Sequence, residues 1–296
     1  MNTKTIYALG FFDGVHIGHG ALLRACKQLA AAQSCRCGAV TFTSHPDGLV
    51  SGTAPKLINT ASDRAMLMRQ LYGMDCIVEL PFDNAMRNTS WQSFYRMLCS
   101  RYGAAGFVCG HDFRFGKGGE GTAKLLQEIC AKDGIPCMVI PEQKLEGTTV
   151  SSSYIRSLLL QGDIRRANAF LGHTHIFTGT VVPGQQLGRT LGTPTANLLL
   201  PDTLLCPKFG VYACMARLEN HRYPAVTNIG CRPTVGGKHV TVEAWLLGYS
   251  GDLYGKAFTL EFHSFLREEK KFASLAALQE EIQKNAAQTL EFFQKS

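Results

Sequence analysis

The chain has 296 residues, of which 45% are hydrophobic, and it carries a formal net charge of +7. This length favours two domains of about 150 residues each, and the hydrophobic share can fill two cores, which argues against wholesale disorder. No apolar run reaches the length of about 18 residues that a membrane span needs, so no membrane association is expected. Asp13 comes before any signal peptide could be completed, and we therefore expect a cytoplasmic protein.

Basic residues are spread along the chain, and the densest run, residues 267–271, contains two glutamates as well. A nucleic-acid-binding face would carry mainly positive charges, with few acidic residues among them, so no nucleic-acid partner is expected. A modest positive excess also suits small phosphorylated substrates.

The cysteines are scattered along the chain and include no C-x-x-C pair. Cys35 and Cys37 are too close together for a structural zinc hook, and most of the others lie in apolar surroundings. We expect reduced thiols that pack inside the two cores.

Alternating strand and helix patterns fill the first half of the chain. Helices are expected at 18–33, from an N-cap at Ser62 to about Gly73, at 90–102 and at 122–132. Strands are expected at 5–11, 38–42, 75–80, 105–109 and 136–140. Repeated βα units predict a parallel, doubly wound α/β sheet, in which ligands bind outside the carboxyl ends of the strands.

A helix that opens at residues 151–153 and a second short helix that reaches Leu171 end this half. Beyond His175 the pattern is all-β, so we expect domains at 1–170 and 171–296. A long C-terminal helix places Leu275, Leu278 and Ile282, with Leu290, on one apolar stripe. Strands are expected at 176–182, 211–218, 222–228, 240–247 and 256–265, which together with the covering helix suggest a small barrel.

A glycine-rich turn at residues 10–19 lies between the first strand and the first helix. Gly14 and Gly18 allow the backbone to approach a phosphate closely, and the helix adds free N–H groups. His16 and His19 flank Gly18, so both imidazoles can face one phosphate and stabilise charge on it during in-line displacement. Two ordinary turn histidines are the alternative.

A second anion site is suggested at residues 151–156, where serines open a helix and Arg156 follows one turn later. Simple capping by Ser152 is compatible with the same residues. Phe42 and His45 at one strand end, and Asp112 after another, fall where a parallel sheet presents ligands.

The second half contains a glycine-punctuated segment, residues 184–197, that has no Walker motif. Such a loop can wrap phosphates, and Thr195 and Asn197 offer the hard oxygen ligands that Mg²⁺ accepts. Taken alone, the segment is more typical of a surface β-turn. Glu243 interrupts an apolar strand and is either a solvated carboxylate or the base that accepts a hydroxyl proton in a kinase.

The N-terminal motifs resemble the paired H-x-G-H and S-S-[ST]-x-I-R signature of the nucleotidyltransferase superfamily. The forms G-x-F-D-G-x-H-x-G-H, T-F-x-x-H-P and D-F-R-F-G are similar to those of the bacterial bifunctional riboflavin kinase/FMN adenylyltransferases. This resemblance implies a Rossmann-like domain in which His16, His19 and Arg156 contact the ATP phosphates and Asp112 helps to hold ATP or flavin. Further contacts expected on this basis are Gly14, Gly18, His45 and Ser152 with ATP, and Phe42 with flavin.

The C-terminal motifs resemble the riboflavin kinase module of the same family in order and spacing. They are G-R-T-L-G-x-P-T-A-N at 188–197, residues 228–234, residues 251–255 and L-R-x-E-x-x-F at 266–272. The resemblance implies a split β-barrel with Thr195 and Asn197 at Mg²⁺-ATP and Glu243 as the base for the ribityl hydroxyl. It also implies that Gly188 contacts ATP and that Arg267 contacts flavin.

Three residues depart from the family pattern. Ser44 stands where a proline is usual, Ser153 replaces a threonine and Thr193 replaces a phenylalanine. We expect changes in local packing near the flavin contacts and in the second loop.

The sequence thus predicts an enzyme that converts riboflavin and ATP to FMN, and FMN and ATP to FAD. The alternatives are a kinase with an inactive N-terminal fold, a flavin-responsive regulator, and a cytidylyltransferase fused to a β-domain. The sequence does not indicate the oligomeric state.

Overall fold

The computed structural model describes residues 4–50, 52–183, 193–234 and 237–295. The chain forms two compact units, the first made of Met1–Leu57 and Ala61–Ser152 and the second of Ile58–Thr60 and Ser153–Ser296. The division at residue 170 that the sequence suggested stays a prediction.

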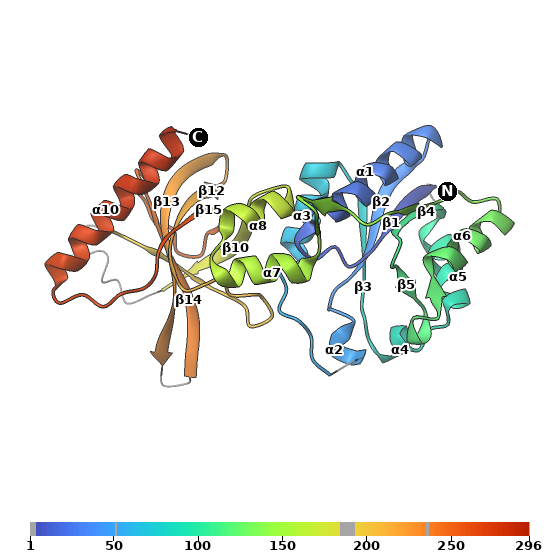
Figure 1. The fold of residues 1–296 in the computed structure, drawn as a ribbon, viewed down its shortest axis with the longest axis horizontal. Helices are drawn as coiled ribbons and strands as arrows, with labels where there is room; N and C mark the ends of the chain where they lie inside the picture. Colours follow the sequence, from blue (N-terminus) through green and yellow to red (C-terminus); the bar gives the residue numbers. More distant parts are fainter. Residues whose placement is uncertain (1–3, 51, 184–192, 235–236, 296) are drawn as a thin grey trace. The chain divides into compact units, whose positions relative to one another are not determined.

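A parallel sheet is the framework of the first unit (Figure 1). Among the described residues its strand order is β3-β2-β1-β4-β7. The order reverses beside β1, and ligands of such sheets bind at this switch point. The strands are β1 (Thr5–Leu9), β2 (Arg36–Phe42), β3 (Cys76–Leu80), β4 (Ala104–Gly110) and β7 (Cys137–Ile140).

Helices cover both faces of this sheet. On one side α1 packs on β1 and β2 and is itself covered by α3. On the other side Tyr7 and Leu9 of β1 pack with Phe94, Leu98 and further residues of α5 and α6 in a continuous apolar core. The helices are α1 (Ile17–Ala32), α2 (Asp47–Val50), α3 (Ala61–Tyr72), α4 (Asn84–Arg87), α5 (Trp91–Tyr102) and α6 (Ala123–Lys132).

Small elements connect these layers. The 3₁₀ turns are η1 (Asp13–Val15) and η2 (Lys117–Gly119). Short two-stranded ribbons pair β5 (Arg114–Phe115) with β6 (Gly121–Thr122), and β8 (Lys144–Leu145) with β9 (Thr148–Thr149).

A closed antiparallel barrel is the core of the second unit, with the order β10-β11-β14-β13-β12-β15 in the described residues. Two helices precede it, α7 (Ser152–Gln161) and α8 (Ile164–Leu171). Asn168 links α8 to the barrel through two hydrogen bonds. Its side-chain NH₂ donates to the Phe262 carbonyl, and its side-chain oxygen accepts from the His175 N–H. The strands are β10 (His175–Val182), β11 (Ala196–Leu199), β12 (Gly210–Leu218), β13 (His221–Thr234), β14 (Gly237–Leu246) and β15 (Ala257–Arg267).

The C-terminal helix α10 (Leu275–Gln294) packs on β12 and β13 (Figure 1). Its predicted apolar stripe is partly wrong, since Leu275 is 64% exposed and Leu290 is 41% exposed. The buried face instead includes Asn285 and Thr289, because Asn285 accepts a hydrogen bond from Arg267 and Thr289 donates one to the Asn285 carbonyl.

The predicted fold class is confirmed: a Rossmann-like sheet with helices is followed by a six-stranded barrel and a C-terminal helix. Two local predictions are wrong. The third helix begins at Ala61, so Ser62 lies within its first turn and is not its cap. Residues 196 and 197, placed in the glycine-punctuated loop, belong instead to strand β11, because residues 196–199 pair with β14.

All eleven cysteines lie in the described part of the chain and carry free thiols, as the sequence indicated. None of the helices in this part combines the length and apolar character that crossing a membrane requires.

One buried histidine makes the second unit sensitive to acid. Burial lowers the pKa of His175 to about 3, with a smaller effect from His173, and its Nδ1 has no hydrogen-bond partner in the described residues. The folded state therefore binds fewer protons than the unfolded state below the ordinary pKa of about 6.5. The stability that neutral His175 contributes is present above pH 6.5 and is lost as the pH falls towards 3.

His175→Phe should therefore flatten the acid loss of stability. Because one shifted group changes the free energy of unfolding by about 1.4 kcal/mol per pH unit, the variant should lose less stability than the wild type between pH 6 and 5. Urea unfolding followed by tryptophan fluorescence at both pH values measures this. His221→Phe, at an exposed site, is the matched control, and an unchanged pH slope in His175→Phe contradicts the prediction.

Candidate active sites

The turn after β1 has a constrained backbone. Phe12, Gly14 and Val15 have positive φ angles of 60°, 80° and 45°. Such values cost free energy in residues other than glycine and are typical of functional turns. Ser152 stabilises the turn, because its hydroxyl donates to the Asp13 carbonyl at 2.9 Å. Helix α1 begins just after this turn, at Ile17.

His16 caps α1, since its Nδ1 accepts a hydrogen bond from the His19 N–H at 3.2 Å. The two imidazoles stack with centroids 3.6 Å apart and an interplanar angle of 13°. A Cβ on Gly18 would come within 3.1 Å of the His16 ring. Gly18 therefore leaves room for the capping imidazole.

The hydrogen bonds indicate the tautomers of this pair. Because His16 Nδ1 accepts a hydrogen bond, neutral His16 carries its hydrogen on Nε2. His19 Nδ1 is buried without a hydrogen-bond partner in the described residues, and an unpaired lone pair costs less than an unpaired N–H. Burial, then the charges of His16 and Arg64, hold the pKa of His19 well below 6.5. We therefore assign His19 as a neutral imidazole with its hydrogen on Nε2.

A cavity of about 510 Å³ opens at the carboxyl ends of β1, β2 and β4. This volume is that of a small-molecule site. The predicted site residues that line it are His16, Gly18, His19, Phe42, Asp112 and Ser152.

Three other predicted residues are placed differently. Gly14 is buried within the turn, and His45 packs edge-on against Phe11, with ring centroids 4.7 Å apart. Neither is among the residues that line the cavity. Arg156 lies on α7 in the second unit, so its contact with phosphate stays a prediction.

Strand pairing in the barrel brings three functional side chains into one row. Glu243 of β14 is paired with Asn197 of β11 on one side and with Asn228 of β13 on the other. Side chains of directly paired residues lie about 5 Å apart at Cβ, on the same face of the sheet. Val242 and Ala244 are buried in the barrel, so Glu243 points away from its interior, as strand alternation predicted.

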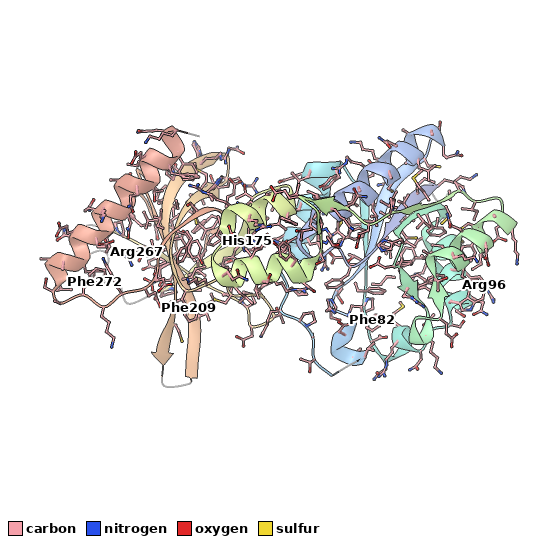
Figure 2. The ribbon with its side chains drawn as sticks, viewed as in Figure 1. Phe82, Arg96, His175, Phe209, Arg267 and Phe272 are labelled. Carbon is pink, nitrogen blue, oxygen red and sulfur yellow. The ribbon has the colours of Figure 1, made fainter. Side chains whose placement is uncertain are left out.

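Glu243 and Asn228 of this row line a pocket of about 320 Å³, together with Thr195, Trp245 and Arg267. Helix α10 closes one side through Asn285. The side chain of Arg267 is held firmly, because Nε bonds to Asn285 Oδ1 and Glu281 Oε1, both at 3.1 Å. Its guanidinium lies over the Phe272 ring, 5.7 Å from the centroid (Figure 2).

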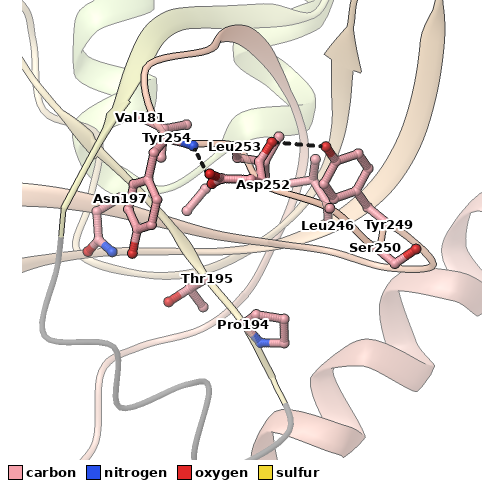
Figure 3. Close-up of a pocket in the computed structure, with 12 residues that line it drawn as sticks. Val181, Pro194, Thr195, Asn197, Leu246, Tyr249, Ser250, Asp252, Leu253 and Tyr254 are labelled. Atoms are coloured by element: carbon pink, nitrogen blue, oxygen red, sulfur yellow. Dashed lines mark hydrogen bonds between the residues drawn. The ribbon is translucent and has the colours of Figure 1, made fainter.

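A neighbouring pocket of about 220 Å³ shares Thr195 as a wall residue and adds Asn197 (Figure 3). Asp252 shapes its far side by accepting hydrogen bonds from the Tyr254 N–H and, through its carbonyl, from the Tyr249 hydroxyl. Thr195 is thus at the junction of two pockets. The predicted contact Gly188 lies outside the described residues.

The family models match each unit separately, "FAD synthetase" over residues 1–154 and "Riboflavin kinase" over 171–293. The bifunctional riboflavin kinase/FMN adenylyltransferase of Bacillus subtilis is 32% identical over 98% of this chain and 93% of its own length. The chain belongs to the bifunctional riboflavin kinase/FMN adenylyltransferase family. The Pseudomonas fluorescens member is 35% identical, covering 95% and 91% of the two chains.

The fold also matches a crystal structure that is named a macrolide-efflux protein from Streptococcus pneumoniae. The TM-score is 0.86 at 26% identity, with 98% of this chain and 94% of the other covered. The likeness therefore includes the elements of both units.

Several residues of this family member were not predicted from its sequence. Glu281 and Asn285 read as ordinary residues of an amphipathic helix, and Arg64 reads as a surface arginine. Each is recognisable only once its partner is known. Glu281 and Asn285 both contact Arg267, which lies 14 positions before Glu281 and 18 before Asn285 in the sequence. Asn228 belongs to a recognised motif, but its pairing with Glu243 required the strand register.

Gly18→Ala should weaken binding of a nucleoside triphosphate to the first unit by about tenfold, because the added methyl displaces the His16 ring. Isothermal titration with a non-hydrolysable ATP analogue measures the change. Gln28→Ala, at an exposed position of the same helix, should bind as the wild type does. Equal affinity in Gly18→Ala would show that the imidazole stack does not contribute to binding.

Proposed function

We propose that this enzyme phosphorylates riboflavin to FMN in its second unit and adenylylates FMN to FAD in its first. The strand register that sets Glu243 beside Asn197, with Glu243 in one pocket of the second unit and Asn197 in the neighbouring one, supports the proposal, together with the stacked histidines in the cavity of the first unit. Each site lies in the segment that matches the corresponding family model. The small-molecule substrates are riboflavin, FMN and ATP.

In the first unit, an oxygen of the FMN phosphate attacks the α-phosphorus of ATP. A P–O bond forms to FMN while the bond to pyrophosphate breaks, and the charge that develops is spread over the α-phosphate oxygens. The Nε2–H groups of His16 and His19 and the N-terminus of α1 donate to these oxygens. Because the imidazoles act here as hydrogen-bond donors, the step needs no proton transfer and no covalent intermediate.

In the second unit, Glu243 accepts the proton of the terminal ribityl hydroxyl as its oxygen attacks the γ-phosphorus of ATP. A P–O bond forms to riboflavin and the bond to ADP breaks. Arg267, fixed by Asn285 and Glu281, is the proposed flavin contact in the same pocket. Thr195 joins this pocket to the neighbouring one, which is the proposed nucleotide site.

Magnesium fits the second site chemically. The Thr195 hydroxyl and the Asn197 amide oxygen are the hard ligands that Mg²⁺ accepts alongside nucleotide phosphates, and both line the proposed nucleotide pocket. When bound, Mg²⁺ would neutralise phosphate charge. The ATP contacts of Gly188 and Arg156, the cytoplasmic location and the lack of a nucleic-acid partner remain predictions from the sequence.

His19→Ala should lower the rate of FAD formation from FMN and ATP by roughly a hundredfold, because it removes a donor to the reacting phosphate. FMN formation from riboflavin should stay within about twofold of the wild type, since Glu243 and its pocket belong to the other unit. Chromatography of the flavin products measures both rates. Equal loss of both activities would contradict the assignment of His19 to one reaction.

Glu243→Gln should impair FMN formation and spare FAD formation. It keeps the shape of the side chain but removes the base, so FMN formation should fall roughly a hundredfold or more while supplied FMN is still converted to FAD. Glu280→Gln, at an exposed position of α10, is the matched control and should keep both activities. Unchanged kinase turnover in Glu243→Gln would show that the base lies elsewhere.

A further inference from the structure

A fully buried arginine lies behind the first active site. Arg64 projects from α3, and its side chain is 0% exposed. Burial lowers the pKa of Arg64, while the buried carboxylate of Asp13 and the exposed carboxylate of Glu79 act in the opposite direction. Nε and Nη1 have no hydrogen-bond partner in the described residues. A buried cation with unmade hydrogen bonds is costly, so its position calls for an explanation beyond packing.

Two contacts of Arg64 lead to the cavity wall. Nη2 donates to the Phe42 carbonyl at 2.7 Å, at the end of β2. The guanidinium carbon lies 4.4 Å from the centroid of the Phe11 ring, in the turn after β1. Phe11 and Phe42 both line the 510 Å³ cavity. One side chain thus fixes two neighbouring strand ends that form one wall of the site.

We propose that Arg64 is a positioning residue for adenylyl transfer, which holds Phe11 and Phe42 where the flavin of FMN is bound. This inference rests on the proposed function of the first unit. A planar guanidinium suits the task, because one nitrogen can reach the carbonyl while the plane lies on the aromatic ring. A lysine ammonium keeps the charge, but its nitrogen ends about one bond short of Nη2.

Arg64 also acts on the catalytic pair through its charge. The groups that lower the pKa of His19 besides burial are His16, stacked on it, and Arg64. The charged groups that face Arg64 are Asp13 of η1 and Glu79 of β3. Removing the guanidinium charge should therefore raise the pKa of His19 and bring its protonation to a higher pH.

The test compares Arg64→Met and Arg64→Lys in the full chain, with Arg69→Met as a matched control at an exposed position of the same helix. Steady-state kinetics give KM for FMN and kcat for FAD formation, and riboflavin kinase turnover reports the integrity of the other unit. Titration of the His19 ring by NMR gives a readout that does not depend on activity.

Arg64→Met should raise KM for FMN about tenfold and move the His19 titration to higher pH. Arg64→Lys should raise KM for FMN as well but leave the His19 titration as in the wild type, since it keeps the charge. Arg69→Met should change neither. If either Arg64 variant has the same KM for FMN as the wild type, the inference is wrong. Arg64→Lys alone therefore tests it if Arg64→Met does not fold.

The same data separate this inference from the proposed function. If the wild type forms no FAD from FMN and ATP, the proposed function fails, while the His19 titration in Arg64→Met still tests the charge coupling. If the wild type forms FAD and the Arg64 variants match it in KM, only the inference about Arg64 fails.

Discussion

Backbone hydrogen bonding between neighbouring strands decides where the functional side chains of both units lie. Parallel pairing of β1 with β2 and β4 brings their carboxyl ends to one edge, where the 510 Å³ cavity opens. Antiparallel pairing sets Glu243 directly between Asn197 and Asn228. A slip of one residue would turn Glu243 into the barrel, so the chemistry proposed for the second unit depends on this register.

The two units manage charge in different ways. In the first, the proposed phosphate contacts are imidazole and backbone N–H groups, while the buried charge of Arg64 lies behind the cavity wall. In the second, a carboxylate shares its pocket with the cations Arg267 and Lys270, and Glu281 bonds to both. Hydrogen-bond donors suit a step without proton transfer, whereas a carboxylate suits deprotonation of a hydroxyl.

Local patterns in the sequence predicted the elements that depend on local physics. The H-x-G-H turn, helix α5 and strand β12 are examples, because turn residues and apolar periodicity act over a few positions. Strand β11 was missed, since four residues become a strand only by pairing with β14. The buried polar face of α10 and the role of Arg64 were missed for a similar reason: their partners are distant in sequence.

The most direct measurement follows the phosphates of ATP into the flavin products of the full-length enzyme. With riboflavin and γ-labelled ATP, we expect label first in FMN and then in FAD, because kinase turnover transfers the γ-phosphoryl group. With α-labelled ATP, label should enter FAD alone, together with unlabelled pyrophosphate. Label from α-labelled ATP in FMN, or FMN that accumulates without ever giving FAD, would contradict two separate sites of phosphate chemistry on one chain.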